Sequence, residues 1–271
     1  MTRAPATVAR RPMFAAAVLV ALAAAGARAA PGFDSADALL ACMRANLPPT
    51  LRIEQIQLTY ADRAGHRRLL QGTLYAEREH GLLRTMIHID APGDLAGSSY
   101  LGRETADGQE IYLYLPALNR VRRIVGAGVN GALFGTDLSY ADVRQLENAF
   151  SGAHARLEGG GTLDGRSVER LLLSPRPGEA SRYDLIRAWV DRQTCVALKV
   201  DFEAGGKPVK QLTAPARALR QSDGYWYLER MQLHDLEQGT STELRVLGVQ
   251  SGGKLPSPLF DRNTFYLGGG M

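Results

Sequence analysis

The sequence has few of the residues that build metal centres and catalytic nucleophiles. It contains two cysteines and five histidines in 271 residues. Two cysteines are too few for a zinc site, and the histidines lack metal-ligand spacing such as H-E-x-x-H. No G-x-S-x-G motif marks a hydrolase nucleophile. The sequence therefore predicts no resident metal, no cofactor and no enzyme activity.

The chain also lacks net charge once its first 29 residues are set aside. It carries 32 Lys and Arg against 28 Asp and Glu, and four of the arginines precede Ala30, where no acidic residue occurs. The remainder is electrically balanced, so it has no domain-wide basic field that would attract phosphate backbones. We therefore expect no nucleic-acid partner.

The first 29 residues have the three parts of a secretory signal peptide. Arg3, Arg10 and Arg11 form a positive start, residues 13–25 are apolar, and a small-x-small cleavage site ends at Ala29. An uncleaved anchor would need about 20 apolar residues, more than this run supplies. We expect cleavage after Ala29 and a mature chain in the periplasm of a Gram-negative bacterium. No later segment is apolar enough to span a membrane.

The mature chain, residues 30–271, is expected to form a single, mainly β domain. Apolar residues alternate with polar ones in several segments, such as 55–60 and 196–203, as in strands with one face on a core. Turn signals such as Asp164-Gly165 and Asp223-Gly224 recur at the spacing of antiparallel strands. This pattern predicts about 10–11 strands. Two short helices are expected, from Asp34 or Ser35 to about Asn46 and over 139–147.

Two predicted strands, 111–115 and 183–190, are apolar on both faces. Both faces must then be covered, and two short helices cannot cover a sheet of this size. An apolar concave surface is therefore expected to remain open for a ligand. Its candidate lining residues are aromatic, with ordinary core packing as the alternative for each: Tyr112, Tyr114, Phe134, Tyr140, Trp189, Tyr225 and Tyr227.

Export would place the two cysteines in an oxidising compartment. Cys42 and Cys195 could then close a disulfide across a loop of about 150 residues. Two separate buried thiols are the alternative, because the sequence does not supply the distance between them.

The most distinctive segment is 111–147, IYLYLPALNRVRRIVGAGVNGALFGTDLSYADVRQLE. Its YLPAL, RVRRI and FGTDLSYAD stretches resemble the exported outer-membrane lipoprotein-sorting protein family, the LolA-like group. The later stretch from Ala188 through Lys210 is also similar to that family. The resemblance implies an open, antiparallel half β-barrel with helices over its concave face. It also implies lipid or lipid-modified protein cargo, with an inner-membrane transporter and an outer-membrane acceptor as possible partners.

The same segment carries charges of both signs close together. Arg120, Arg122 and Arg123 precede Asp137 and Asp142, and guanidinium groups can hold carboxylates in bidentate pairs. Such pairs would pin the glycine-rich loop 126–135 over the barrel mouth. Two alternatives are an ordinary solvated edge and recognition of an acidic headgroup.

The loop 126–131 also matches G-x-G-x-x-G. Dinucleotide binding by that motif requires a βαβ unit, whereas the surrounding chain is typical of antiparallel β structure. We therefore interpret the glycines as a mobile flap with Phe134 as its apolar tip.

Three functions fit these patterns to different degrees. The first is a soluble periplasmic carrier that shields acyl chains from water while they move between membranes. The second is an interaction protein that docks on an efflux-type exporter or an envelope-stress sensor and transfers nothing. The third, a hydrolase using a carboxylate or His88, has the least support, because turns and ion pairs explain these residues equally well.

Overall fold

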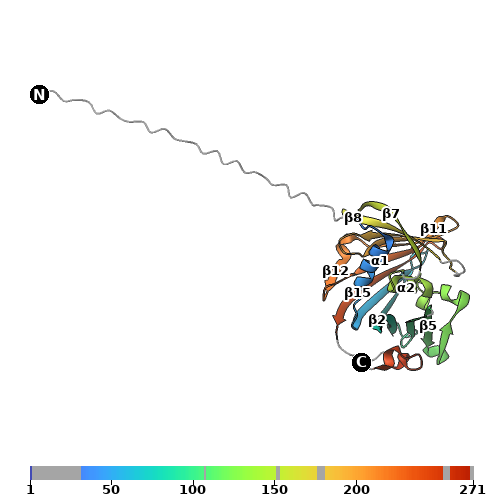
Figure 1. Ribbon diagram of the computed structural model, residues 1–271. Coiled ribbons are helices and arrows are strands. Elements are labelled where there is room, and N and C mark those ends of the chain that lie inside the picture. Colours follow the sequence, from blue (N-terminus) through green and yellow to red (C-terminus); the bar gives the residue numbers. More distant parts are fainter. Residues whose placement is uncertain (2–31, 107, 151–152, 176–180, 253–256, 269–271) are drawn as a thin grey trace.

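Figure 1 shows a computed structural model of the chain, which describes residues 1, 32–106, 108–150, 153–175, 181–252 and 257–268. Apart from Met1, the predicted signal peptide 1–29 lies outside the described residues, so its presence and cleavage stay predictions. Within these described ranges, no helix has the length and apolar character needed to cross a membrane.

The described residues are dominated by antiparallel strands (Figure 1). The first six are β1 (Arg52–Ala61), β2 (Arg67–Glu79), β3 (Leu82–Ala91), β4 (Ser99–Thr105), β5 (Gly108–Leu115) and β6 (Arg120–Ile124). The next five are β7 (His154–Leu163), β8 (Arg166–Ser174), β9 (Leu185–Asp191), β10 (Ala197–Ala204) and β11 (Lys207–Thr213). The last four are β12 (Leu219–Ser222), β13 (Tyr225–Leu228), β14 (Arg230–Asp235) and β15 (Thr240–Ser251).

Thirteen of the described strands form one sheet in the order β6-β5-β4-β3-β2-β1-β15-β14-β11-β10-β9-β8-β7. The sheet thus consists of two meanders joined where β1 pairs with β15. Its two edges, β6 and β7, are not paired with each other, so the barrel is open. The predicted fold class is confirmed. The sheet has more strands than the 10–11 expected, because several turns carry no glycine signal in the sequence.

Two α-helices lie over the concave face of the sheet (Figure 1). Helix α1 (Ala36–Ala45) begins at Ser35, whose side chain accepts a hydrogen bond from the Ala38 amide. Helix α2 (Tyr140–Glu147) begins with a capping box between Ser139 and Asp142. Both helices were predicted, and the side-chain caps explain why they start where they do.

Short 3-10 helices complete the chain: η1 (Pro116–Leu118), η2 (Gly126–Asn130), η3 (Leu133–Gly135), η4 (Ala216–Ala218), η5 (Ser257–Phe260) and η6 (Phe265–Leu267). The segment from η2 to α2 connects β6 to β7, the two edges of the open sheet. Because it must cross from one edge to the other, it brings α2 over the concave face.

Tight turns set the register of three hairpins. Asp164-Gly165, Gly205-Gly206 and Asp223-Gly224 all have positive φ at both residues, the backbone that a two-residue hairpin turn requires. The third turn joins β12 and β13 into a separate two-stranded sheet. Tyr225 and Tyr227 therefore lie on a different strand from Met231 and Leu233.

The two faces of the sheet carry separate apolar clusters. The concave cluster joins both α-helices to strands on both sides of β1, with Leu39, Val143 and Phe202 among its members. The convex cluster packs η5 and η6 against β2 to β5, with the fully buried Phe265 among its members. The C-terminal segment thus supplies the second cover that strand β5 needed, and no helix had been predicted for that role.

Candidate binding pocket

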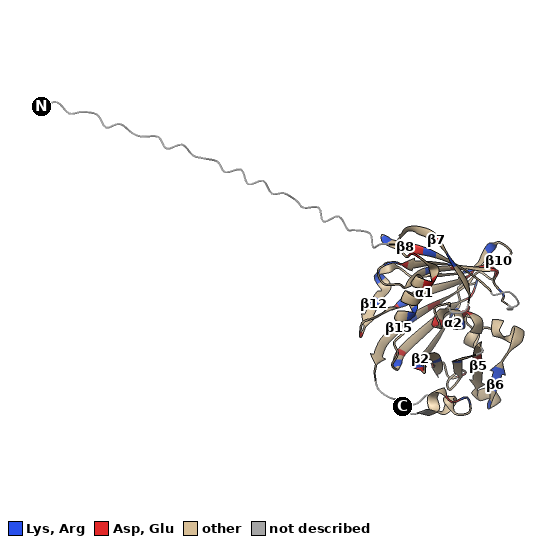
Figure 2. Ribbon diagram, viewed as in Figure 1, with Lys and Arg blue, Asp and Glu red and all other residues tan. Residues whose placement is uncertain are grey.

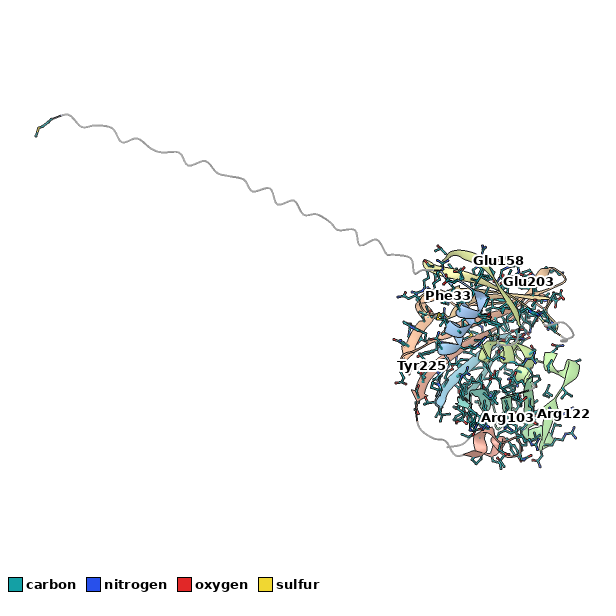
Figure 3. The ribbon with its side chains drawn as sticks, in the orientation of Figure 1. Phe33, Arg103, Arg122, Glu158, Glu203 and Tyr225 are labelled. Carbon is teal, nitrogen blue, oxygen red and sulfur yellow. A yellow bond between two sulfur atoms is a disulfide. The ribbon has the colours of Figure 1, made fainter. Side chains whose placement is uncertain are left out.

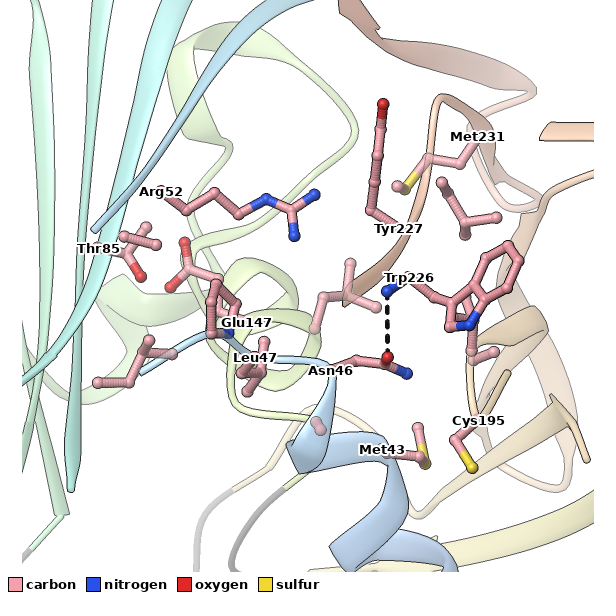
Figure 4. A pocket seen from close by; sticks show the side chains of 18 of the residues that line it. Met43, Asn46, Leu47, Arg52, Thr85, Glu147, Cys195, Trp226, Tyr227 and Met231 are labelled. Carbon is pink, nitrogen blue, oxygen red and sulfur yellow. Dashed lines mark hydrogen bonds between the residues drawn. The ribbon is translucent and has the colours of Figure 1, made fainter. Parts of the chain in front are cut away.

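Two adjoining pockets of about 280 and 220 Å³ lie between the concave face and the elements that cover it. Together they form what we call the concave pocket, of which Figure 4 shows the larger part. Eight residues line both parts, and most of them are apolar. The eight are Glu54, Leu74, Leu146, Glu147, Leu212, Tyr227, Leu228 and Met231. A mostly apolar lining with a few polar groups is typical of sites for small apolar or amphipathic ligands.

Three covering elements are linked at one end of the concave pocket. Asn46, which ends α1, donates through Nδ2 to the Thr194 carbonyl at 2.6 Å and accepts from the Trp226 amide at 3.2 Å (Figure 4). Cys42 of α1 and Cys195 form a disulfide with a Cα–Cα distance of 5.8 Å. Helix α1, the β12–β13 hairpin and the β9–β10 turn are therefore held together beside the pocket.

Two charged residues of β1 face the concave pocket. Arg52 Nε lies 2.6 Å from Glu54 Oε1, and the guanidinium lies 4.7 Å from the centre of the Tyr227 ring. Burial raises the pKa of Glu54, and the positive charge of Arg52 opposes part of that shift. The Arg52–Glu54 ion pair is thus a polar site within an otherwise apolar pocket wall.

A second carboxyl group, that of Glu147, enters the concave pocket from α2. Both of its oxygens are buried and have no hydrogen-bond partner among the described residues. Burial raises the pKa of Glu147 to about 8; the nearby Thr85 hydroxyl opposes the shift and Glu104 adds to it. The group is therefore mostly a neutral carboxylic acid at pH 7.

Buried polar contacts anchor the start of α2 to the sheet. Lys210 Nζ donates to the Asp137 carbonyl oxygen at 2.6 Å and to Asp142 Oδ2 at 2.9 Å. Tyr183 donates to Asp142 Oδ1 at 2.7 Å, and Thr242 donates to Asp137 Oδ2 at 2.6 Å. Burial and the neighbouring Asp142 charge raise the pKa of Tyr183, which keeps its hydroxyl a donor.

The arginine pinning proposed for the glycine-rich loop is not what the structure has. Arg120, Arg122 and Arg123 lie on β6, where all three are exposed; Figure 2 shows this strand as a basic edge, and Figure 3 labels Arg122 at its rim. The one ion pair described for the three joins Arg123 to Glu110, at 3.2 Å. Asp137 and Asp142 are instead held by Lys210, Thr240, Thr242 and Tyr183. A buried carboxylate needs buried donors, and an edge strand cannot supply them.

The predicted aromatic lining residues fall in three places. Tyr227 lines the concave pocket. Phe134 and Tyr140 are buried in the concave cluster, where Tyr140 stacks on Tyr100 at a centroid distance of 6.2 Å. Phe134 is thus part of the core and not the tip of an exposed flap. Its neighbour Leu133 lines the pocket instead.

The other four predicted aromatics lie away from the concave pocket. Tyr112 belongs to the convex cluster, and Tyr114 stacks on Tyr266 at 4.0 Å. Trp189 lies under the Lys199 ammonium at 4.2 Å, on the opposite side of β9 from the concave cluster. Tyr225 lies beside the hairpin turn at the rim (Figure 3). For the aromatics of β5 and β9 the reason is parity, because Leu113 and Ala188, not their aromatic neighbours, face the concave side.

The polar residues of the concave pocket were missed, although the sequence contains a signal for them. Arg52 and Glu54 have the same strand parity as Ile56 and Leu58, which are buried in the concave cluster. Glu147 lies one helical turn after Val143, another member of that cluster. A charged residue on an otherwise apolar face of a strand or helix is the signal that could have identified these pocket residues.

His88 makes a structural contact. Its Nδ1 lies 2.9 Å from Ser99 Oγ on the neighbouring strand, and burial lowers its pKa. In the described part of the chain, no three His, Cys, Asp or Glu side chains are gathered so that they could hold a metal ion.

Comparisons with known proteins agree with this fold. A family model described as "Uncharacterized protein" matches residues 81–266, more than half of the chain. No curated protein matches the sequence. A DUF1329 family protein from Desulfovibrio piger is similar in structure, with a TM-score of 0.76 and 22% identity, covering 82% of this chain and 94% of its own.

Two further solved structures carry names that agree with the predicted resemblance. A putative outer membrane lipoprotein-sorting protein domain from Vibrio parahaemolyticus has a TM-score of 0.76 and 23% identity, covering 84% of this chain and 97% of that one. A LolA superfamily protein from Nitrosomonas europaea has a TM-score of 0.67 and 16% identity, with the same coverage of both chains. The chain therefore belongs to the family whose model spans residues 81–266, and its fold is that of the LolA-like outer-membrane lipoprotein-sorting proteins.

Proposed function

We propose that the mature chain is a periplasmic carrier that shields acyl chains of lipids or lipoproteins between the inner and outer membranes. The observation that carries this proposal is the apolar concave pocket beneath α1, α2 and the β12–β13 hairpin. The fold shared with proteins named for lipoprotein sorting supports it. In this proposal the chain performs no chemistry, and a donor transporter and an outer-membrane acceptor are its partners.

The energetic need for such a carrier is large. Exposing a 16-carbon chain to water costs on the order of 12 kcal/mol, at about 0.8 kcal/mol per CH₂ group. A carrier must replace the membrane with a comparable apolar surface. The leucines of the concave pocket, such as Leu74, Leu146 and Leu212, offer that kind of surface.

The test is to purify the exported protein from its native host, extract it with organic solvent and analyse the extract by mass spectrometry. The wild-type protein should release lipid or acylated peptide. Ala76→Phe should release much less, because Ala76 lines the concave pocket and the added ring occupies its volume. Ala117→Phe is the matched control, because Ala117 is exposed in η1 outside the pocket.

Equal lipid release from both variants and the wild type would contradict carriage in this pocket. An empty wild-type protein that co-purifies stably with a membrane protein would instead support the interaction-protein alternative.

A further inference from the structure

The concave pocket contains hydrogen-bonding groups that the chain itself leaves unused. Arg52 Nη2 and both carboxyl oxygens of Glu147 are buried without a hydrogen-bond partner among the described residues. Buried polar groups in native proteins are nearly always paired, and an unpaired one is expensive. Both side chains line the same part of the pocket (Figure 4), so a single bound group can reach the two.

The strand register explains why these groups meet. Arg52 of β1 pairs with Ala76 of β2, and Ala76 pairs with Thr85 of β3, which forms one lateral row on the concave face. Glu147 descends onto this row from α2, and Thr85 contributes to setting its pKa. The next row, with Leu74 and Ile87, is apolar apart from Glu54. The polar row thus borders a region suited to a hydrocarbon chain.

The charges already in the pocket restrict what can bind at this row. A cationic headgroup would lie beside the Arg52 guanidinium. An anionic headgroup would lie beside Glu54, whose carboxylate is paired with Arg52 at 2.6 Å. A neutral acceptor brings no charge into a low-dielectric pocket, and it can accept from both Arg52 and a carboxylic acid. The carbonyl oxygen of an acyl ester or amide is such an acceptor.

We propose that Arg52 and the carboxyl group of Glu147 bind the carbonyl oxygen of an ester- or amide-linked acyl chain. This subsite rests on the proposed carrier function and makes it more specific. It selects acylated molecules over other long-chain amphiphiles, because the tail fills the leucine-lined part while the carbonyl group completes the polar row. The same chemistry is offered by a glycerolipid ester and by the amide-linked chain of a lipoprotein.

The test uses two ligands that differ in the carbonyl group alone. Monopalmitoylglycerol and 1-O-hexadecylglycerol have the same chain length and the same glycerol head, but the second has an ether in place of the ester. Binding is followed by the fluorescence of Trp226, which lines the pocket, in a Trp189→Phe background that removes the other tryptophan. We expect the ester to bind about tenfold more tightly or better, the effect of hydrogen bonds from buried charged or acidic donors.

Variants then assign the preference to the polar row. Glu147→Leu should lose most of the preference for the ester, because only the Arg52 donor remains, and should keep its affinity for the ether. Glu147→Gln, which retains a donor, should keep most of the preference. Glu243→Leu is the matched control, because Glu243 lies on β15 with the parity opposite to that of the pocket residues Thr242 and Leu244. Thermal unfolding verifies that each variant is folded.

The possible outcomes separate this subsite from the carrier function. Equal binding of ester and ether to the wild type would overturn the subsite and leave apolar carriage intact. Failure of both ligands to bind would overturn both proposals. Tighter binding of hexadecylamine or palmitate than of the ester would overturn the neutral-acceptor assignment. Comparing N-palmitoylethanolamine with monopalmitoylglycerol distinguishes an amide-linked from an ester-linked source.

Discussion

The two faces of the sheet are both covered by a segment that crosses the strands, yet they differ in how completely they are filled. On the convex face, η5 and η6 insert Leu259, Phe260 and Phe265 directly onto the strands, and all three are buried. On the concave face, α1, α2 and the β12–β13 hairpin surround pockets of about 280 and 220 Å³. The apolar strand face is therefore packed against the C-terminal segment on the convex side, where an open hollow is bordered by Tyr112 and the polar residues Arg123, Arg262 and Asn263. On the concave side a mostly apolar pocket remains.

This comparison shows that an apolar face is not by itself a binding site. Tyr112 and Leu113 are adjacent in β5 and both buried, but they serve opposite faces. The convex residues contribute stability through close packing, whereas the concave residues also leave space. Substitutions on the two faces should therefore separate stability from ligand binding.

The largest effect is expected in the convex cluster. Phe265→Ala should lower the free energy of unfolding by about 4 kcal/mol, because Phe265 is fully buried and its removal leaves a cavity. Lipid content should be unchanged, because the pocket lies on the other face. Urea unfolding measures the loss, and Leu267→Ala, at a residue 71% exposed in the same helix, is the control. A simultaneous loss of bound lipid would show that the two faces are coupled.

A slightly smaller loss is expected where α2 is anchored above the concave face. Lys210→Met should lower the free energy of unfolding by about 3 kcal/mol, because it leaves the Asp142 carboxylate buried without its cation. Lys199→Met should change it by less than about 1 kcal/mol, since Lys199 pairs with Asp201 at a partly exposed position. Chemical unfolding of both variants measures the two losses in the free energy of unfolding. Similar losses would contradict the expectation that a buried ion pair matters more to stability than a partly exposed one.

Glu147 should make the concave face sensitive to pH. Its pKa is raised to about 8 in the folded chain from its ordinary value of 4.5, so the native state holds the proton more tightly than the unfolded state. The contribution of Glu147 to stability is therefore greatest below about pH 4.5, falls as pH rises toward 8, and levels off above that value. Arg52, Glu54 and Glu104 lie near Glu147 and are the same in the wild type and in the variant compared below.

Glu147→Gln removes this titration. Each unit of pKa shift corresponds to about 1.4 kcal/mol, and entry of water into the pocket reduces the total, so the variant should be more stable than wild type by ~2 kcal/mol at pH 9. The two proteins should converge near pH 5. Unfolding midpoints measured from pH 5 to 9 check this, and parallel curves would contradict a raised pKa for Glu147.

The smallest effect is expected at the open edge. Arg123→Ala should change the free energy of unfolding by about 0–1 kcal/mol, because its pair with Glu110 is more than half exposed on the arginine side. Lipid content should also be unaffected, since Asp137 and Asp142 are held by other groups. A large loss in either measurement would restore the pinning role that the sequence suggested for the arginines of β6.

Local features of the fold were readable from the sequence because they depend on neighbouring residues. The Ser139 capping box, the glycine turns and the alternation along β10 are short-range patterns with short-range causes. The LolA-like resemblance carried by residues 111–147 is likewise local, and the solved structures agree with it.

The site was harder to predict, since its residues come from distant parts of the chain. Arg52, Thr85, Glu147 and Tyr227 meet through strand register and the crossing of α2. The emphasis on aromatic residues was misplaced, because aliphatic side chains, leucines above all, form most of the apolar wall. Cys42 and Cys195, 153 residues apart, were a possible pair that only the coordinates bring within 5.8 Å.

The amino-acid order by itself determined that the strands have two distinct faces, where they turn and where the helices begin. It did not determine which face is hollow, because a period of two marks two sides without distinguishing them. The tertiary structure determines which face is hollow, because the link from β6 to β7 crosses one side and the C-terminal segment packs on the other. The same arrangement brings Arg52 and Glu147, which are far apart in the sequence, into the lining of one pocket.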